Sequence, residues 1–296
     1  MRKRIKNTII YFFVLFFVHF IRLVPRRIGI AMMRTLGRIA FWAARSERDK
    51  TIRHLTFAFG EEKSAKEIKG LARSVFLHFS MAAVDAIRIP VFVKKGINQF
   101  VSTENMQYAE NARDAKRGPI ILTAHFGNWE LMGAWLAQNG FPLRVIGTSA
   151  YDPRLDKMIV KTRNGAGYKN IARGKNTREI IRVLRQGIPL GILIDQDTRV
   201  EGVFVDFFGR KAHTATGPVV LAQKFNVPIV PIFIRLKKDL NYHIECFPPI
   251  KLEDTGNPEK DLIVNTQKCS DAIEHMVRRY PEQWVWMHER WKKQPG

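Results

Sequence analysis

The chain has 296 residues, of which 46% are hydrophobic and 26% charged, an ordinary balance for a folded protein with a sizeable core. Lys and Arg number 49 against 27 acidic residues, which gives a formal net charge of +22. Such an excess predicts a polyanionic partner: nucleic acid, an anionic membrane surface or an acidic protein. The two cysteines, Cys246 and Cys269, show neither metal-ligand spacing nor a disulfide framework, so we interpret them as reduced packing residues.

The first 25 residues indicate a membrane anchor. The basic stretch MRKRIK precedes NTIIYFFVLFFVHFIRLVP, whose apolar run is close to the roughly 17–25 residues that a membrane span requires. A cleaved signal peptide would place small residues after this run, but the sequence has Pro25-Arg26-Arg27 there. We therefore predict an uncleaved anchor over residues 1–25. Arginines flank both ends, so the positive-inside rule leaves its orientation open.

The next segment, residues 26–45, has the pattern of a basic amphipathic helix. One stripe at helical spacing holds Arg27, Arg34, Arg38 and Arg45, and the other side holds Met32, Met33, Leu36, Ile39 and Ala43. Such a helix can lie on an anionic headgroup layer. It can equally pack its apolar side on the rest of the protein with its arginines in solvent. The sequence is compatible with both, and they are not exclusive.

The remaining residues, 26–296, are predicted to form one α/β domain. Residues 47–88 are predicted to be helical, with Ser64 as an N-cap and Glu67 completing a capping box. Apolar runs of strand length (PIILTA, LRVIGTS, PLGILID, VPIVPIFIRL, NYHIECFPPI) then alternate with helical stretches. This alternation predicts a mixed central sheet covered by helices. A closing helix leads into the aromatic tail PEQWVWMHERWKK.

The stretch AHFGNWE, residues 124–130, carries the first candidate site. His125 stands just past the predicted strand PIILTA, and ligands of open α/β sheets bind outside the carboxyl ends of strands. Asn128 is a good N-cap for a helix that begins at Trp129. Glu130 then falls in the first helical turn, where we expect its carboxylate to meet the imidazole and fix its tautomer, leaving the other nitrogen as a general base. The alternative is a histidine that ends a turn, with Glu130 serving the helix dipole.

Two further segments offer polar and aromatic groups. Asp195 and Asp197 follow the strand PLGILI, where they can orient substrate hydroxyls, hold a hydrated cation or shape a turn. In GVFVDFFGRKAHTATG, Phe208 beside Arg210 suits a ligand with a hydrophobic part and an anionic part, or single-stranded nucleic acid, or else forms a packed loop. Thr216 can open a helix whose amides accept a phosphate. No serine or cysteine nucleophile motif is evident, so direct transfer to a substrate hydroxyl is the simpler reaction.

Taken together, AHFGNWE, LIDQD, GVFVDFFG with TATGP, VPIVPIF and PEQWVWMHERWK resemble the late acyltransferases of lipid A biosynthesis. These lauroyl and myristoyl transferases of Gram-negative inner membranes belong to the H-x4-D/E glycerolipid acyltransferase superfamily. The resemblance covers nearly the whole chain. It implies that His125 deprotonates the acceptor hydroxyl and that Glu130 orients and polarises it. Arg163 would stabilise the oxyanion or hold a lipid phosphate.

The same resemblance implies the partners and the location. The donor would be a fatty acyl thioester on acyl carrier protein or CoA, and the acceptor a hydroxyl of a lipid A precursor. No metal and no further cofactor would be needed, and the catalytic domain would lie on the cytoplasmic side of the bacterial inner membrane. An acidic carrier protein, an anionic bilayer and a phosphorylated acceptor all suit the positive charge. Two alternatives stay open: a mannosyl lipid or glycerolipid acceptor, and, more remotely, a membrane-tethered protein that binds nucleic acid.

We expect substrate contacts from seven residues: Asn128, Arg163, Asp195, Asp197, Phe208, Arg210 and Thr216. The departure DTRVEGVFV lies within one of the matching segments, and it leaves the acyl chain length and the order of acylation undetermined.

Overall fold

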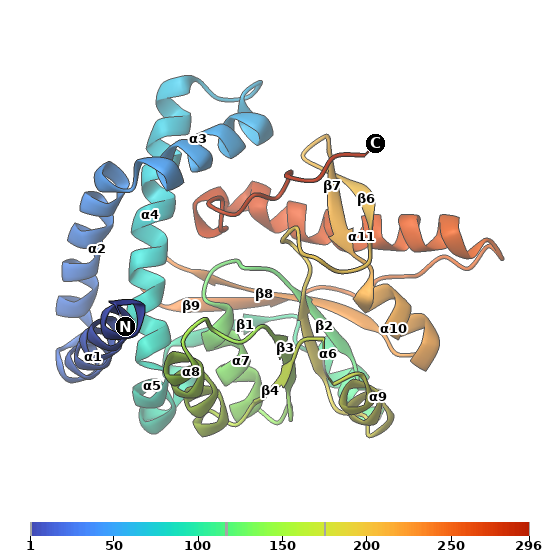
Figure 1. Ribbon diagram of the computed structural model, residues 1–296. Coiled ribbons are helices and arrows are strands. Elements are labelled where there is room, and N and C mark those ends of the chain that lie inside the picture. Colours follow the sequence, from blue (N-terminus) through green and yellow to red (C-terminus); the bar gives the residue numbers. More distant parts are fainter. Residues whose placement is uncertain (1, 116–117, 175, 296) are drawn as a thin grey trace.

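A seven-stranded sheet with the order β1-β9-β8-β2-β5-β3-β4 forms the centre of the protein (Figure 1). The computed structural model describes residues 2–115, 118–174 and 176–295. The strands of this sheet are β1 (Val101–Glu104), β2 (Ile120–Thr123), β3 (Arg144–Gly147), β4 (Lys169–Ala172), β5 (Leu190–Leu193), β8 (Ile229–Leu236) and β9 (Tyr242–Cys246). The five strands from β8 to β4 are parallel, whereas β9 pairs antiparallel with β8 and parallel with β1. The predicted mixed α/β sheet is confirmed.

Helices cover both faces of this sheet. On one face α3 (Arg45–Phe59), α4 (Ala65–Ile87), α9 (Thr177–Arg185), α10 (Gly217–Phe225) and α11 (Pro258–Arg279) share an apolar core with the sheet. On the other face the cover comes from α5 (Ile89–Lys95), α6 (Gln107–Asp114) and α7 (Trp129–Gln138). The central strand β2 is buried along its whole length, which is why its sequence is a continuous apolar run rather than an alternating one.

The predicted helical stretch 47–88 is two helices, because the chain turns between Gly60 and Ser64. The Ser64 side chain accepts a hydrogen bond from the Glu67 amide, and the Glu67 carboxylate accepts one from the Ser64 amide. The predicted capping box is therefore confirmed.

A two-stranded antiparallel hairpin, β6 (Gly202–Phe207) and β7 (Arg210–Ala215), lies outside the main sheet. The sequence suggested a ligand-binding segment here without predicting strands. Phe208 and Gly209 form its turn, both with positive φ, at 54° and 69°. A phenylalanine in this conformation is uncommon, and burial of its ring among neighbouring aromatics holds it there.

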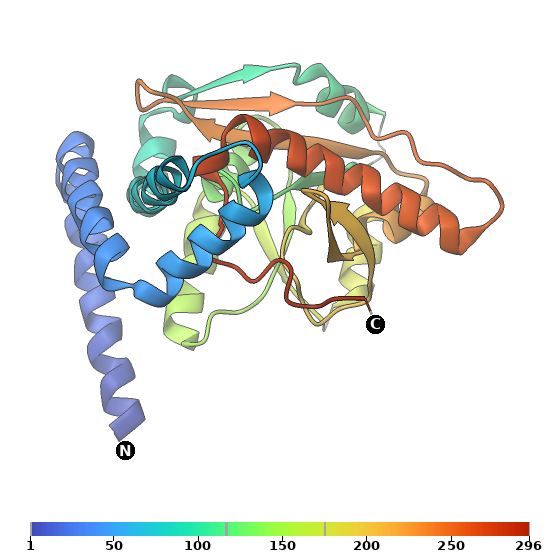
Figure 2. The ribbon, with the colours of Figure 1, turned by 90° about the horizontal axis from the view of Figure 1, so that it is seen from above.

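The N-terminal helices α1 (Arg2–Leu23) and α2 (Arg26–Ala43) stand beside the sheet, and α1 extends beyond the rest of the molecule (Figure 2). Helix α1 contains an apolar stretch, Asn7–Leu23, that leaves Phe12, Phe13 and Phe16 more than 60% exposed. Among the described helices α4, and not this shorter stretch, is long and apolar enough to cross a membrane, but Ala72, Val75 and Val84 of α4 are fully buried in the protein. Helix α1 is thus the exposed apolar helix of the N-terminal region.

The packing interpretation of the amphipathic segment holds in part, and its contact with a headgroup layer stays a prediction. Helix α2 packs on α4 through a face that includes Gly29, Ile30, Gly37 and Phe41. Most of its large apolar side chains instead remain exposed, namely Ile28, Met32, Leu36, Ile39 and Trp42. A contiguous exposed apolar strip of this kind is typical of a surface that binds a membrane or a partner.

We predict that Gly37→Ala separates α2 from α4. An added methyl would overlap the Ser80 hydroxyl and lie 3.1 Å from the Phe76 carbonyl oxygen, so we expect a loss of about 1–3 kcal/mol in unfolding free energy. Thermal unfolding in detergent measures the change. The matched control is Gly70→Ala on α4, where a methyl meets nothing within 4 Å; it should stabilise the helix by about 0.5–1 kcal/mol. Equal behaviour of the two variants would refute the close packing.

Candidate active site

The loop between β2 and α7 carries His125 at the carboxyl edge of the sheet. Gly127 in this loop has φ +60°, and a side chain there would overlap the carbonyl oxygen of Ile234 on β8, so glycine is required. The Gly127 amide donates to the Gln283 carbonyl at 2.8 Å, and Phe126 forms an isolated antiparallel bridge with Trp284. The C-terminal tail thus holds this loop in place.

His125 is bound by a buried carboxylate from the neighbouring strand. Its Nδ1 lies 2.9 Å from Asp195 Oδ1, and its backbone amide donates to Oδ2 at 2.8 Å. The indole of Trp284 donates to the same Oδ2 at 2.8 Å. Burial alone would raise the pKa of Asp195, but His125 and these hydrogen bonds bring it below its usual value. An ionised Asp195 fixes the ring and its tautomer, and leaves Nε2 for a substrate.

The expected contact between Glu130 and the imidazole is wrong. Glu130 instead forms a two-pronged ion pair with Arg163 of α8 (Pro153–Gly165), with Nε to Oε2 at 2.9 Å and Nη2 to Oε1 at 2.5 Å. The Tyr168 hydroxyl donates to Oε2 at 2.7 Å. Burial would raise the pKa of Glu130, but Arg163 and Tyr168 lower it below its usual value. The helix directs this carboxylate towards α8, while β5, which pairs with β2, presents Asp195 to His125.

Glu130 and Arg163 form one polar unit, and Glu130 follows His125 by five positions, in the first turn of α7. A third residue, Asn170 on β4, accepts from Arg163 Nη1 at 2.6 Å. Burial would lower the pKa of Arg163, yet the pairing with Glu130 raises it, so the guanidinium remains charged. The site therefore holds two separate acid–base pairs, His125 with Asp195 and Arg163 with Glu130.

Asn128 is the N-cap of α7, as predicted. Its Oδ1 accepts from the Leu131 amide at 3.1 Å, and its Nδ2 donates to the Ala82 carbonyl at 3.1 Å and to the Tyr242 hydroxyl at 3.4 Å. The side chain is buried and engaged in these bonds. Its contact with substrate stays a prediction.

Asp197 lies next to a second set of polar residues from β7 and the tail. Its carboxylate is 3.4 Å from His213 Nδ1 and 3.3 Å from Lys293 Nζ, and it accepts from the Lys293 amide at 3.1 Å. Arg290, 1% exposed, donates to the His213 carbonyl at 2.6 Å. Burial lowers the pKa of Arg290 to about 10, so it stays charged at neutral pH and offsets the charges of both aspartates.

The three remaining candidates belong to the hairpin and the helix that follows it. The amide of Phe208 donates to Glu274 of α11, and the Arg210 guanidinium lies 4.3 Å from the Phe57 ring centroid. Thr216 is buried at the start of α10. In the described part of the chain their side chains and backbone contact α3, α10, α11, the hairpin and Trp286 of the tail, and not His125 or Asp195. Their role in substrate binding stays a prediction.

The sequence did not point to Tyr168, Trp284 or Arg290 individually, although the aromatic tail that contains two of them was evident. Among the described residues no group of three or more His, Cys, Asp or Glu side chains is arranged to hold a metal ion.

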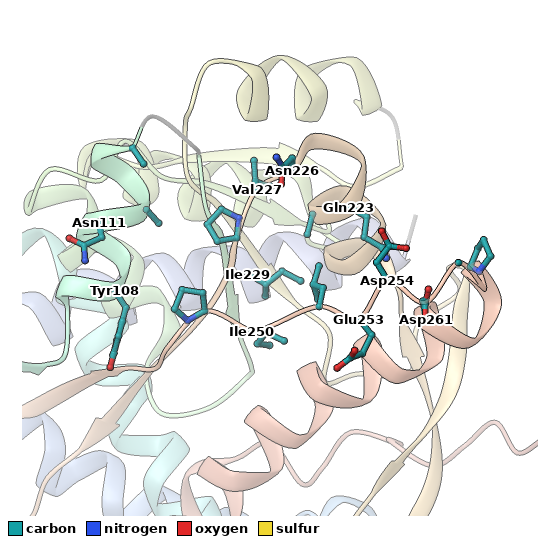
Figure 3. A pocket seen from close by; sticks show the side chains of 18 residues that line it. Tyr108, Asn111, Gln223, Asn226, Val227, Ile229, Ile250, Glu253, Asp254 and Asp261 are labelled. Carbon is teal, nitrogen blue, oxygen red and sulfur yellow. The ribbon is translucent and has the colours of Figure 1, made fainter.

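A cavity of about 990 Å³ lies apart from this site (Figure 3). Tyr108, Val227, Ile229, Ile250 and Asp261 are among the residues that line it. It borders the amino end of β8, which runs parallel to β2, whereas His125 follows the carboxyl end of β2. The cavity and His125 are therefore at opposite edges of the sheet.

The chain is similar to several known acyltransferases. The chain is 24% identical to a phosphatidylinositol mannoside acyltransferase of Mycolicibacterium smegmatis, over 70% of this chain and 67% of that protein. It is also 24% identical to the lipid A biosynthesis acyltransferase of Haemophilus influenzae, over 92% and 84%, and to the lipid A biosynthesis lauroyltransferase of Escherichia coli, over 88% and 84%. Residues 1–293 match the family model of the bacterial lipid A biosynthesis acyltransferases, and the chain belongs to that family.

Proposed function

We propose that the protein transfers a fatty acyl chain from an acyl carrier protein thioester to a hydroxyl of a lipid A precursor, with His125 as the general base. Family membership supports acyl transfer in lipid A biosynthesis. The observation that carries the assignment of the base is the 2.9 Å hydrogen bond between His125 and the buried Asp195. This bond leaves Nε2 of a partly exposed ring at the carboxyl edge of the sheet, where ligands of α/β proteins bind.

In the proposed reaction Nε2 of His125 accepts the proton of the acceptor hydroxyl as the oxygen attacks the thioester carbonyl. Asp195 stabilises the imidazolium that forms, as a buried carboxylate does for the histidine of other acyl-transfer enzymes. The tetrahedral intermediate collapses with cleavage of the C–S bond, and the imidazolium returns its proton to the departing thiolate. The acyl group passes directly between substrates, with no covalent acyl-enzyme and no cofactor besides the thioester.

Arg163 is the proposed electrostatic partner of this reaction. Held by Glu130, it presents a fixed positive charge that can stabilise an oxyanion or bind a phosphate of the acceptor. Glu130 then acts by orienting Arg163 instead of the acceptor hydroxyl directly. This revises the role that the sequence resemblance implied.

The exposed apolar helix α1 and the exposed strip on α2 support an attachment to the inner membrane, with the sheet on the cytoplasmic side. A net charge of +22 suits an anionic bilayer, a phosphorylated acceptor and an acidic carrier protein. The relative that acts on phosphatidylinositol mannoside makes a mannosyl lipid the second candidate acceptor.

We predict that His125→Gln lowers the rate of acyl transfer by about 10²–10⁴-fold, because the base is removed. Steady-state transfer from acyl carrier protein by the purified protein in detergent measures this. His275→Gln, a histidine on α11 that contacts Phe247, is the matched control and should keep the parental rate. A parental rate for His125→Gln would exclude the mechanism.

Asp195→Asn tests whether Asp195 or Glu130 is the carboxylate that assists His125 as the base. The amide keeps the size of the side chain but removes the charge that fixes the tautomer, so we expect a loss of about 10²–10⁴-fold in kcat. Glu130→Gln should cost a smaller or similar factor, by loosening Arg163. If Asp195→Asn is fully active while Glu130→Gln is not, the His125–Asp195 pair has no catalytic role.

The acceptor is tested in cells. Cells that lack the protein should lose one secondary acyl chain from lipid A, and expression of the protein in those cells should restore it. Mass spectrometry of extracted lipid A measures both changes. Unchanged lipid A together with an altered mannosyl lipid would favour the second acceptor. Parallel assays with acyl carrier protein and CoA thioesters identify the donor; we expect faster transfer from the carrier protein.

A further inference from the structure

A line of buried polar side chains connects the N-terminal helices with the loop that carries His125. Arg26 at the start of α2 donates to both carboxylate oxygens of Asp85 on α4, each at 2.7 Å. The hydroxyl of Tyr242 on β9 donates to Asp85 Oδ2 at 2.9 Å. Asn128 Nδ2 in turn donates to the Tyr242 oxygen at 3.4 Å. Four residues from four separate segments thus form one chain of hydrogen bonds.

This chain is closed to solvent at its centre. Asp85 and Tyr242 are fully buried, and Asn128 is 3% exposed. A carboxylate in such a place needs charged and polar donors, and Arg26 and Tyr242 supply three hydrogen bonds. Burial and the charge of Asp85 hold the pKa of Tyr242 well above its usual value, so its hydroxyl stays protonated and donates to Asp85. Its oxygen then accepts from Asn128.

At the active-site end the chain fixes the amide group of Asn128. With Nδ2 held by Tyr242 and the Ala82 carbonyl, Oδ1 faces the Leu131 amide and caps α7. Glu130, which binds Arg163, lies in the turn that this cap defines. A shift of the amide would therefore move the first turn of α7 relative to His125.

At its other end this chain of hydrogen bonds reaches the turn between α1 and α2, which is itself hydrogen-bonded to the domain. Arg88 Nη1 donates to the carbonyls of Ile21 and Val24, at 2.5 and 2.7 Å. Arg22 Nε returns a hydrogen bond to the Ile87 carbonyl at 2.9 Å. The turn between α1 and α2 is thus attached to the end of α4, next to Asp85, rather than joined to the domain by a flexible tether.

We infer that Arg26, Asp85 and Tyr242 are positioning residues, which hold the first turn of α7 in register with His125 and make the N-terminal helix pair part of the active-site frame. The kinetic side of this inference rests on the proposed acyl transfer. The structural side does not, because the order of the α7 start can be measured without turnover.

The kinetic test uses Tyr242→Phe in the full-length protein. The variant keeps the buried ring but removes the hydroxyl that joins Asp85 to Asn128. We expect kcat to fall about 10–100-fold with KM for the acyl donor unchanged, because the reacting groups are misplaced and not removed. Tyr108→Phe on α6 is the matched control and should behave as the parent. A parental kcat for Tyr242→Phe would overturn the inference.

Hydrogen exchange supplies the readout that is independent of activity. In Tyr242→Phe and Arg26→Lys, exchange should accelerate in peptides covering residues 126–136, with β2 and β5 unchanged. Arg34→Lys, an exposed position on the same helix α2, should leave these peptides as in the parent. A uniform acceleration across the sheet, or none at the start of α7, would overturn the inference.

The kinetic and hydrogen-exchange measurements distinguish a failure of the positioning inference from a failure of the proposed function. If the parent protein transfers no acyl chain to lipid A precursors, the proposed function fails, and exchange at residues 126–136 alone decides whether the chain of hydrogen bonds positions α7. If the parent is active and Tyr242→Phe changes neither kcat nor exchange, the positioning inference fails while the proposed function stands.

Discussion

The arrangement of the candidate site depends on the buried carboxylate of Asp195. It accepts hydrogen bonds from the ring and the amide of His125 and from the indole of Trp284, and so joins the ends of β2 and β5 to the C-terminal tail. Each donor is itself fixed by backbone pairing, because Phe126 bridges Trp284 and β2 pairs with β5. A charge without solvent is costly unless every acceptor is used, and this requirement brings the three segments to one point.

Much of the framework was predictable, because local sequence patterns determine it. The buried strands β2, β5 and β8 are continuous apolar runs, and the caps at Ser64 and Asn128 have their helix-starting residue types. The short strands β1 and β4 were not predicted. Their sequences, VSTE and KNIA, lie partly exposed at the two edges of the sheet, and they show neither the alternating hydrophobic pattern of a strand nor the 3.6-residue pattern of a helix. Edge strands carry little of the hydrophobic pattern on which such predictions depend.

The partner of His125 could not be read from spacing. Five positions separate it from Glu130, whereas the carboxylate that reaches its ring is seventy positions away on a neighbouring strand. The direction of Glu130 depends on Arg163 and Tyr168, and no pattern within AHFGNWE encodes them. Sequence could locate both acids at strand or helix ends facing one edge, but which of them meets the imidazole is decided by the pairing of β2 with β5.

The participation of Trp284 has a consequence for biosynthesis. The apolar helix α1 precedes every described strand in the chain, while the tail that secures His125 and Asp195 follows β9 and α11. A growing chain therefore contains α1 long before its imidazole can be held in place. Assembly of the His125–Asp195–Trp284 cluster is in this way deferred until translation has passed the tail.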